Sequence, residues 1–187
     1  MVTTRTPAGA AGGCKASDFR LRGTDEKIWT LADCRGERGT VVMFICNHCP
    51  YVQAVLGQII RDAQELRALG VGSVAIMSND TRAYPADAFP RMQALAKDKA
   101  FPFPYLLDET QDIARAYGAV CTPDFFGFDA DLALRYRGRI TAAGRQPAPA
   151  AARRELFEAM RQVAETGQAP AEQHPSIGCS IKWRTEP

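Results

Sequence analysis

Two kinds of hydrophobic pattern follow one another along the chain. Short apolar runs rich in β-branched and aromatic residues predict strands, and longer segments whose apolar residues recur every three or four positions predict helices. The predicted strands are FRLRG, EKIWTL, TVVMFI, SVAIMSND and PYLLD, followed by a hairpin of DFFGFD and LALRYRG. The predicted helices span residues 50–70, 87–99, 110–118 and 150–165. Because strands and helices alternate, the pattern predicts an α/β fold with parallel pairing in a central sheet.

The same patterns divide the chain into three segments. Residues 1–16 are small, polar and glycine-rich, which is typical of a mobile arm. Residues 17–166 hold the predicted strands and helices, enough for one sizeable core. Residues 167–187 form a tail in which apolar positions alternate with polar ones, at Ile177, Cys179, Ile181 and Trp183. This alternation predicts an extended tail that docks on the domain through its apolar face, with Cys179 as a buried structural cysteine or an additional redox thiol.

Composition and charge narrow the classes of function. The 23 basic and 21 acidic residues are spread along the chain and leave a net charge of +2, so there is no basic run to neutralise a nucleic-acid backbone. The N-terminus lacks the apolar stretch of a signal peptide, and no later segment approaches the roughly 18 apolar residues of a membrane span. We therefore expect a cytoplasmic protein that binds neither nucleic acid nor membrane.

The stretch FICNHCPYV carries the clearest chemical signal. It places Cys46 and Cys49 at the turn between the predicted strand 40–45 and the predicted helix 50–70. A helix N-terminus offers unpaired N–H groups and the positive end of the helix dipole, which lower the pKa of a nearby thiol. Cys46 is therefore predicted to be an exposed nucleophile. Cys49, one turn into the helix, is predicted to resolve the mixed disulfide by pairing with Cys46.

Two interpretations of this turn remain open, a redox dithiol and half of a metal site. If the pair is a redox dithiol, His48 lies between the cysteines and stabilises the thiolate, which makes the disulfide more oxidising. If the pair is half of a metal site, further ligands are required, but a second Cys-x-x-Cys or His-x-x-x-His at suitable spacing is missing from the sequence. Only convergence of Cys121, Cys179 or His174 in space would complete a metal or cluster site. The sequence favours redox chemistry.

Together with VCTPDFFGFD, this turn resembles the thioredoxin-like superfamily, in the redoxin branch that is similar to alkyl hydroperoxide reductase and thiol-specific antioxidant proteins. The resemblance covers residues 17–187. It includes the blocks CNHCPYV, SND, FPFPYLLDETQ, AYGAVCTPDFF and PSIGCSIKW, which are typical of a bacterial subgroup of thioredoxin family proteins. It implies a three-layer α/β/α sandwich with a central mixed sheet, an N-terminal β-hairpin and a redoxin-type insertion.

The resemblance also implies which residues surround the dithiol. A cis peptide between Thr122 and Pro123 would face the two cysteines, in a loop that the family uses to pair with substrate backbone. Cys121 stands in the same loop, and we expect it to be the cysteine nearest the dithiol. The chain departs from typical peroxiredoxins, because Met43 and Thr40 replace the threonine and proline of their peroxidatic site.

The function predicted from the sequence is thiol-disulfide oxidoreduction without a bound cofactor. The substrate would be a protein or small-molecule disulfide or thiol, and a cellular reductant or oxidant would complete the cycle. An atypical thiol peroxidase, in which Cys46 is oxidised by peroxide and captured by Cys49, is the alternative enzyme. A metal- or cluster-binding module is the non-enzymatic alternative.

Overall fold

A computed structural model describes residues 3–6, 14–147, 149 and 151–185. In chain order the elements are β1 (Thr3–Arg5), β2 (Arg20–Gly23), β3 (Ile28–Thr30), α1 (Leu31–Cys34), β4 (Gly39–Phe44), α2 (Pro50–Ala68), β5 (Val71–Met77), the 3₁₀ helix η1 (Pro85–Asp87), α3 (Phe89–Asp98), β6 (Tyr105–Leu107), α4 (Asp112–Tyr117), β7 (Cys121–Thr122), β8 (Asp124–Asp129), β9 (Leu134–Gly138), α5 (Glu155–Thr166) and β10 (Ile177–Ser180).

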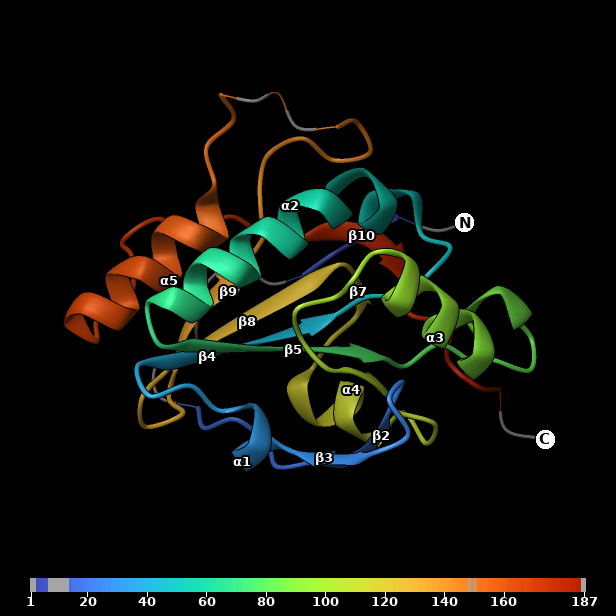
Figure 1. Cartoon of the computed structure of the whole chain (residues 1–187). Coiled ribbons are helices and arrows are strands. Elements are labelled where there is room, and N and C mark those ends of the chain that lie inside the picture. The colour runs from blue at the N-terminus through green and yellow to red at the C-terminus, as the bar shows by residue number, and fades with distance from the viewer. Residues whose placement is uncertain (1–2, 7–13, 148, 150, 186–187) are drawn as a thin grey trace.

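The centre of the molecule is a seven-stranded mixed sheet in the order β3-β2-β6-β5-β4-β8-β9. Strands β4, β5 and β6 are parallel to one another, and the remaining pairs are antiparallel. Helices α2 and α5 cover one face and α1 and α4 cover the other (Figure 1). The expected mixed sheet between two helical layers is confirmed, and the expected hairpins are β2-β3 and β8-β9.

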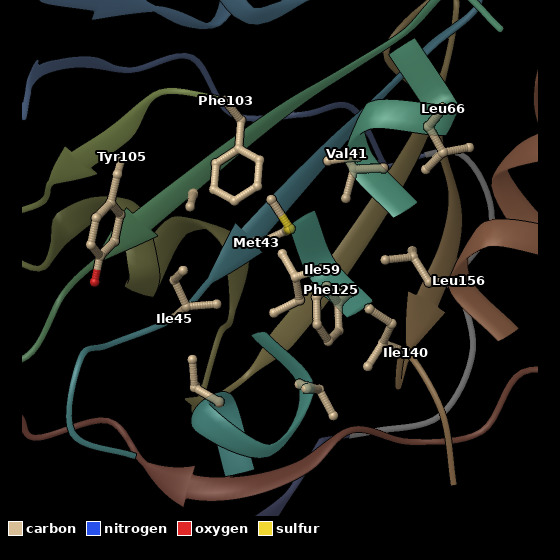
Figure 2. Packing of buried hydrophobic residues seen from close by; sticks show 14 of the residues in the cluster. Val41, Met43, Ile45, Ile59, Leu66, Phe103, Tyr105, Phe125, Ile140 and Leu156 are labelled. Carbon is tan, nitrogen blue, oxygen red and sulfur yellow. The ribbon is translucent and has the colours of Figure 1, made fainter. Parts of the chain in front are cut away.

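The unit that builds the site is β4-α2-β5. All six residues of β4 are buried, as expected for a parallel strand covered on both faces. Side chains alternate across this strand, so that Met43 and Ile45 meet α2, as Figure 2 shows, whereas Phe44 faces the layer of α1 and α4. Helix α2 begins with Pro50 in its first turn and ends before Gly70, which has a positive φ of 78°. The predicted limits of this helix are therefore close to the observed ones.

A second, three-stranded sheet has the order β1-β10-β7 and is antiparallel throughout. It ties the C-terminal strand to the strand that precedes Pro123. Residues 3–5 belong to the segment predicted as a mobile arm, yet they pair with β10 as β1. No sequence pattern indicates this strand, because a three-residue strand depends on its partner. Residues 7–13 of the expected arm lie outside the described residues.

The last helix begins later than predicted. The pattern placed its start at residue 150, but α5 begins at Glu155, and Arg154 has a non-helical backbone. The Arg154 guanidinium lies 2.6 Å from Asp62 and 2.8 Å from Glu65, both on α2. These ion pairs join the N-terminal end of α5 to α2. Because Asp62 is buried, the positive charge of Arg154 compensates the charge of its carboxylate. Among the described residues, no helix is long and apolar enough to cross a membrane.

Candidate active site

The dithiol lies where β4 passes into α2. Cys46 is two residues beyond the end of β4, and Cys49 is the residue that caps the N-terminus of α2. The Cys46 thiol lies beside the Cys49 sulfur and acts on its pKa as a hydrogen-bond donor. The strand fixes the position of the first cysteine and the helix fixes that of the second, so the spacing of two residues brings the sulfurs together.

A buried carboxylate holds the turn between the two cysteines. The side chain of Asp87, from η1, is fully buried, and its Oδ1 accepts a hydrogen bond of 2.8 Å from the backbone N–H of Asn47. Its Oδ2 accepts one of 2.8 Å from the Asn79 side chain. The Asn47 side chain in turn donates to the Ala86 carbonyl at 3.0 Å and accepts from the Tyr105 hydroxyl at 3.0 Å. The turn is therefore fixed by polar contacts on its buried side, which the sequence analysis did not identify.

The loop that carries Pro123 faces the dithiol. The Thr122–Pro123 peptide bond is cis, as the resemblance implied. The Thr122 hydroxyl lies 3.4 Å from the sulfur of Cys46, and the Cys49 thiol donates to the Thr122 carbonyl at 3.1 Å. Thr122 therefore contacts both sulfurs, and the structure brings together four of the predicted residues: Cys46, Cys49, Thr122 and Pro123.

The pKa values of the two thiols in the reduced pair differ from those expected from the sequence. The pKa of Cys49 is lowered to about 5, first by the hydrogen bond from the Cys46 thiol and further by the Cys179 thiol and the Val52 N–H. The pKa of Cys46 is raised well above its usual range, by the hydrogen bond with Cys49, by burial and by the nearby charge of Asp87. The first negative charge of the pair therefore lies on Cys49. In this conformation the low pKa belongs to Cys49 and not, as predicted, to Cys46, mainly because the Cys46 thiol donates to the Cys49 sulfur.

The expected exposure of Cys46 is also wrong. Only 1% of Cys46 is exposed and Cys49 is completely buried, whereas Asn47 and His48 between them are partly exposed. Cys46 contacts the Thr122 hydroxyl on one side and lies near His48 and Asp87 on the other. A reagent therefore reaches the sulfur of Cys46 only when neighbouring groups move.

His48 is placed as a neighbour of the dithiol but contacts the carboxylate first. Its Nδ1 lies 2.7 Å from Oδ2 of Asp87, at ion-pair distance but without hydrogen-bond geometry. Its ring stacks on Tyr84, with centroids 5.9 Å apart and an angle of 3° between the planes. Any effect of His48 on the thiolate therefore acts together with the charge of Asp87.

The third sulfur in contact with the pair belongs to Cys179. The sulfurs of Cys49 and Cys179 are 2.9 Å apart. Cys121, expected to be the nearest cysteine, instead has its thiol directed to the Pro123 carbonyl at 3.7 Å. The reason is strand alternation in β7: Thr122 faces the dithiol, and its neighbour Cys121 takes the other direction. Burial raises the pKa of both Cys121 and Cys179, in the latter case to about 12.

Three side chains near the dithiol lie close enough together to bind a metal ion. One ligand atom each from Cys46, His48 and Asp87 lie within 4.8 Å of one another. His174, by contrast, is bound to Glu155 of α5, with 2.9 Å between Nδ1 and Oε2, and does not join this group. Asp87 is a possible ligand that the sequence pattern did not indicate. The block SND was the one sequence signal near it, because this block contains Asn79, which donates a hydrogen bond to Asp87.

The fold and the cis-proline loop opposite a Cys-x-x-Cys turn define a protein of the thioredoxin-like class. The chain belongs to the AhpC/TSA family, whose pattern matches residues 13–137. It is 39% identical to an uncharacterized conserved protein from Geobacillus kaustophilus, with a TM-score of 0.91 over 100% of this chain and 99% of that one. A hypothetical protein from Sinorhizobium meliloti 1021 is 34% identical, with a TM-score of 0.89 over 99% and 100%.

A more distant structure carries a functional name. A thiol:disulfide interchange protein of the thioredoxin family from Chlorobium tepidum TLS is 18% identical, with a TM-score of 0.60 over 81% of this chain and 96% of that one. At this identity the likeness concerns the fold alone. No curated protein matches the sequence.

Proposed function

We propose that the protein is a thiol-disulfide oxidoreductase whose redox centre is the dithiol of Cys46 and Cys49. The observation that carries the proposal is the contact of both sulfurs with Thr122, beside the cis peptide bond to Pro123. Two thiols joined by a hydrogen bond at the start of a helix have the arrangement that closes an intramolecular disulfide. Membership of the AhpC/TSA family supports thiol chemistry in general.

In the proposed reaction Cys46 attacks and Cys49 resolves. Cys46 lies beside two partly exposed residues, whereas Cys49 is enclosed by β7 and β10. The proton shared by the pair passes to Cys49 as Cys46 attacks one sulfur of a substrate disulfide and one substrate thiolate leaves. Cys49 then loses its proton, attacks the sulfur of Cys46 and releases the second substrate thiolate. The substrate gains two electrons and the dithiol becomes a disulfide.

The proposed partners follow from this chemistry. They are a protein or small-molecule disulfide or thiol as substrate, and a cellular reductant or oxidant that resets the dithiol. A resident cofactor is not required, since the two sulfurs carry the electrons. We place the reaction in the cytoplasm, where most thiols stay reduced and a disulfide at this site would be transient.

Trapping tests the proposal. Cys49→Ser should hold the mixed disulfide on Cys46 when the variant is incubated with an oxidised model peptide, because the resolving thiol is gone. Intact mass before and after dithiothreitol should show one peptide per chain, and peptide mapping should place it at Cys46. The double variant Cys46→Ser, Cys49→Ser is the control. Attachment at any other cysteine would contradict the assignment.

Peroxide reduction is the second candidate, favoured by the AhpC/TSA family. Met43, at the threonine position of typical peroxiredoxins, is buried in the core and offers no hydroxyl to a peroxide. Measuring turnover of hydrogen peroxide and of a disulfide by one preparation, with the same reductant, separates the two. Faster consumption of peroxide than of the disulfide would favour the peroxidase.

Metal binding is the non-enzymatic candidate. It is favoured by the close approach of one ligand atom each from Cys46, His48 and Asp87. The metal content of the purified protein distinguishes it. About one tightly held zinc or iron per chain, lost in Cys46→Ser, would support this role, and a metal-free protein that turns over disulfides would reject it.

A further inference from the structure

Cys179 has no role in the reaction proposed above, yet it touches the dithiol. Its sulfur lies 2.9 Å from that of Cys49, and 2% of the residue is exposed. A disulfide bond is about 2.05 Å long, so a shift of about 1 Å would bring these two sulfurs to bonding distance. The same cysteine, Cys49, therefore has two sulfur neighbours, Cys46 and Cys179.

The C-terminal strand is built to hold Cys179 in this position. Strand β10 runs antiparallel to β7, with Cys179 opposite Thr122 and Ser180 opposite Cys121. Gly178 lies directly on the Thr122–Pro123 peptide: a Cβ atom at residue 178 would be 2.0 Å from the Thr122 carbonyl oxygen. Only glycine allows this approach of backbone to backbone.

Further contacts fix the residues that follow Cys179. The Ile181 N–H donates to the Val120 carbonyl at 3.0 Å. The Lys182 N–H donates to the Asn79 side-chain oxygen at 2.9 Å, and the Asn79 amide also holds Asp87 of the dithiol turn. The tail and the turn thus share one anchor, so the sulfur of Cys179 is positioned relative to the dithiol from both sides.

From this geometry we infer that Cys179 is a third redox thiol, which exchanges with the Cys46–Cys49 disulfide and takes Cys49 as its partner. The inference rests on the proposed function, because that reaction supplies the first disulfide. It assigns the tail strand a part in the chemistry in addition to its part in the fold.

The exchange is balanced without an external oxidant. Cys179 loses its proton, and its sulfur attacks the sulfur of Cys49. The bond between Cys46 and Cys49 breaks as the bond between Cys49 and Cys179 forms, and Cys46 leaves as a thiolate that takes up a proton. One disulfide and one free thiol are present before and after the exchange, so the protein gains and loses no electrons. The negative charge of Cys49, which helps to raise the pKa of Cys179, is absent once Cys49 is oxidised.

The test uses Cys46→Ser, in which Cys179 remains as the described sulfur in hydrogen-bond contact with Cys49. After oxidation with diamide, peptide mapping without reduction should show a Cys49–Cys179 link in most chains. Adding Cys179→Ser should remove the link, whereas adding Cys34→Ser or Cys121→Ser should leave it. A folded Cys46→Ser protein, with a cooperative thermal transition, that forms no such link or links Cys49 to Cys121 would overturn the inference.

A second measurement does not depend on that variant. Oxidised wild-type protein is treated with iodoacetamide, and alkylation is mapped. If exchange occurs, a fraction of chains should carry the label on Cys46 and a Cys49–Cys179 link, and Cys179→Ser should abolish that fraction. A wild-type protein that turns over disulfides but gives only the Cys46–Cys49 link contradicts the inference and leaves the proposed function standing. A wild-type protein that forms no Cys46–Cys49 link on oxidation rejects both.

Discussion

Cys34 and Cys49 are both buried, on opposite faces of the central sheet, yet the pKa values of their thiols shift in opposite directions. Cys34 is the last residue of α1, where burial and the charge of Asp33 raise its pKa to about 12. Cys49 caps the first turn of α2, and its pKa falls to about 5 although burial acts against ionisation there too. Burial without hydrogen-bond donors to the sulfur therefore raises the pKa of a thiol and makes it unreactive.

The difference comes from the donors around each sulfur. Cys49 has the thiols of Cys46 and Cys179 and the Val52 N–H close enough to stabilise a thiolate. The groups that shift the pKa of Cys34 only oppose its charge. The reactive face of the sheet is thus distinguished from the inert one by hydrogen bonds to sulfur, not by the number of cysteines or their depth.

The largest expected effect separates these two cysteines by activity. Cys49→Ser should lower disulfide turnover by roughly 100-fold or more, because a mixed disulfide on Cys46 then has no resolving thiol. Cys34→Ser should leave turnover within about twofold, and should lower the free energy of unfolding by roughly 1 kcal/mol because a hydroxyl is buried in its place. Steady-state rates and thermal melts of both variants check this. Equal losses of turnover would show that the two faces do not differ as proposed.

The next effect concerns the strand that covers the dithiol. Gly178→Ala places a Cβ atom against the Thr122 carbonyl, so β10 must move away and the sulfurs become accessible. We expect alkylation of the reduced Cys46 and Cys49 to become about tenfold faster, because β10 opens more often.

Gly57→Ala is the matched control. Gly57 lies on the exposed side of α2, and none of the described residues, apart from the helix backbone itself, comes within 4 Å of an added Cβ, so alanine there should stabilise the helix by up to about 1 kcal/mol. Its alkylation rate should equal that of the wild type. An unchanged rate in Gly178→Ala would mean that β10 does not limit access to the dithiol.

Titration should sharpen the contrast between the two faces. The folded pKa of Cys49 is depressed from 9.0 to about 5, so its contribution to stability is present above pH 9 and is lost as the pH falls through about 5. The pKa of Cys34 is raised from 9.0 to about 12, so its contribution is present below pH 9 and is lost as the pH rises toward 12.

Denaturant unfolding of the reduced protein measures both contributions. The stability difference between wild type and Cys49→Ser should change between pH 5 and 9, and the difference between wild type and Cys34→Ser only above pH 9. Ultraviolet thiolate absorption of the folded protein should persist down to about pH 5 and should disappear in Cys49→Ser. The same pH profile in both variants would refute the assignment of the charge to Cys49.

Much of this site was readable from the sequence, because its first parts are local. A β-branched run, a Cys-x-x-Cys turn and a helix with proline at its start are adjacent in the chain, so they place Cys46 and Cys49 without any knowledge of tertiary contacts. Thr122 and Pro123 came from the resemblance, and the cis bond fits it.

The parts that could not be predicted depend on pairing between distant segments. Asp87 reaches the dithiol turn because η1 lies beside that turn, and hydrogen bonds from the Asn79 side chain and the Asn47 backbone hold its carboxylate in place. Cys179 reaches Cys49 because of the register of β10 on β7, which no sequence pattern specifies. Cys121 was favoured because it stands two residues before Pro123, but its neighbour Thr122 faces the dithiol, and neighbouring residues in a strand point in opposite directions.

The smallest expected effect tests how the dithiol senses Asp87. In His48→Ala the carboxylate of Asp87 loses the imidazole at 2.7 Å, so more of its charge acts on Cys46. This carboxylate lies beside the dithiol and disfavours the negative charge of its reduced form, which lies on Cys49, so the disulfide becomes less oxidising; we expect the potential to fall by about 30 mV, a tenfold change in the equilibrium constant. Equilibration with glutathione redox buffers gives this value.

His174→Ala is the control for that change. His174 also lies beside a carboxylate, 2.9 Å from Glu155, but it belongs to the segment after α5 and does not contact the dithiol. Its substitution should leave the potential at the wild-type value. A higher or unchanged potential in His48→Ala would mean that the imidazole does not moderate the charge of Asp87. Equal falls in both variants would point to a general effect of removing a histidine and not to this contact.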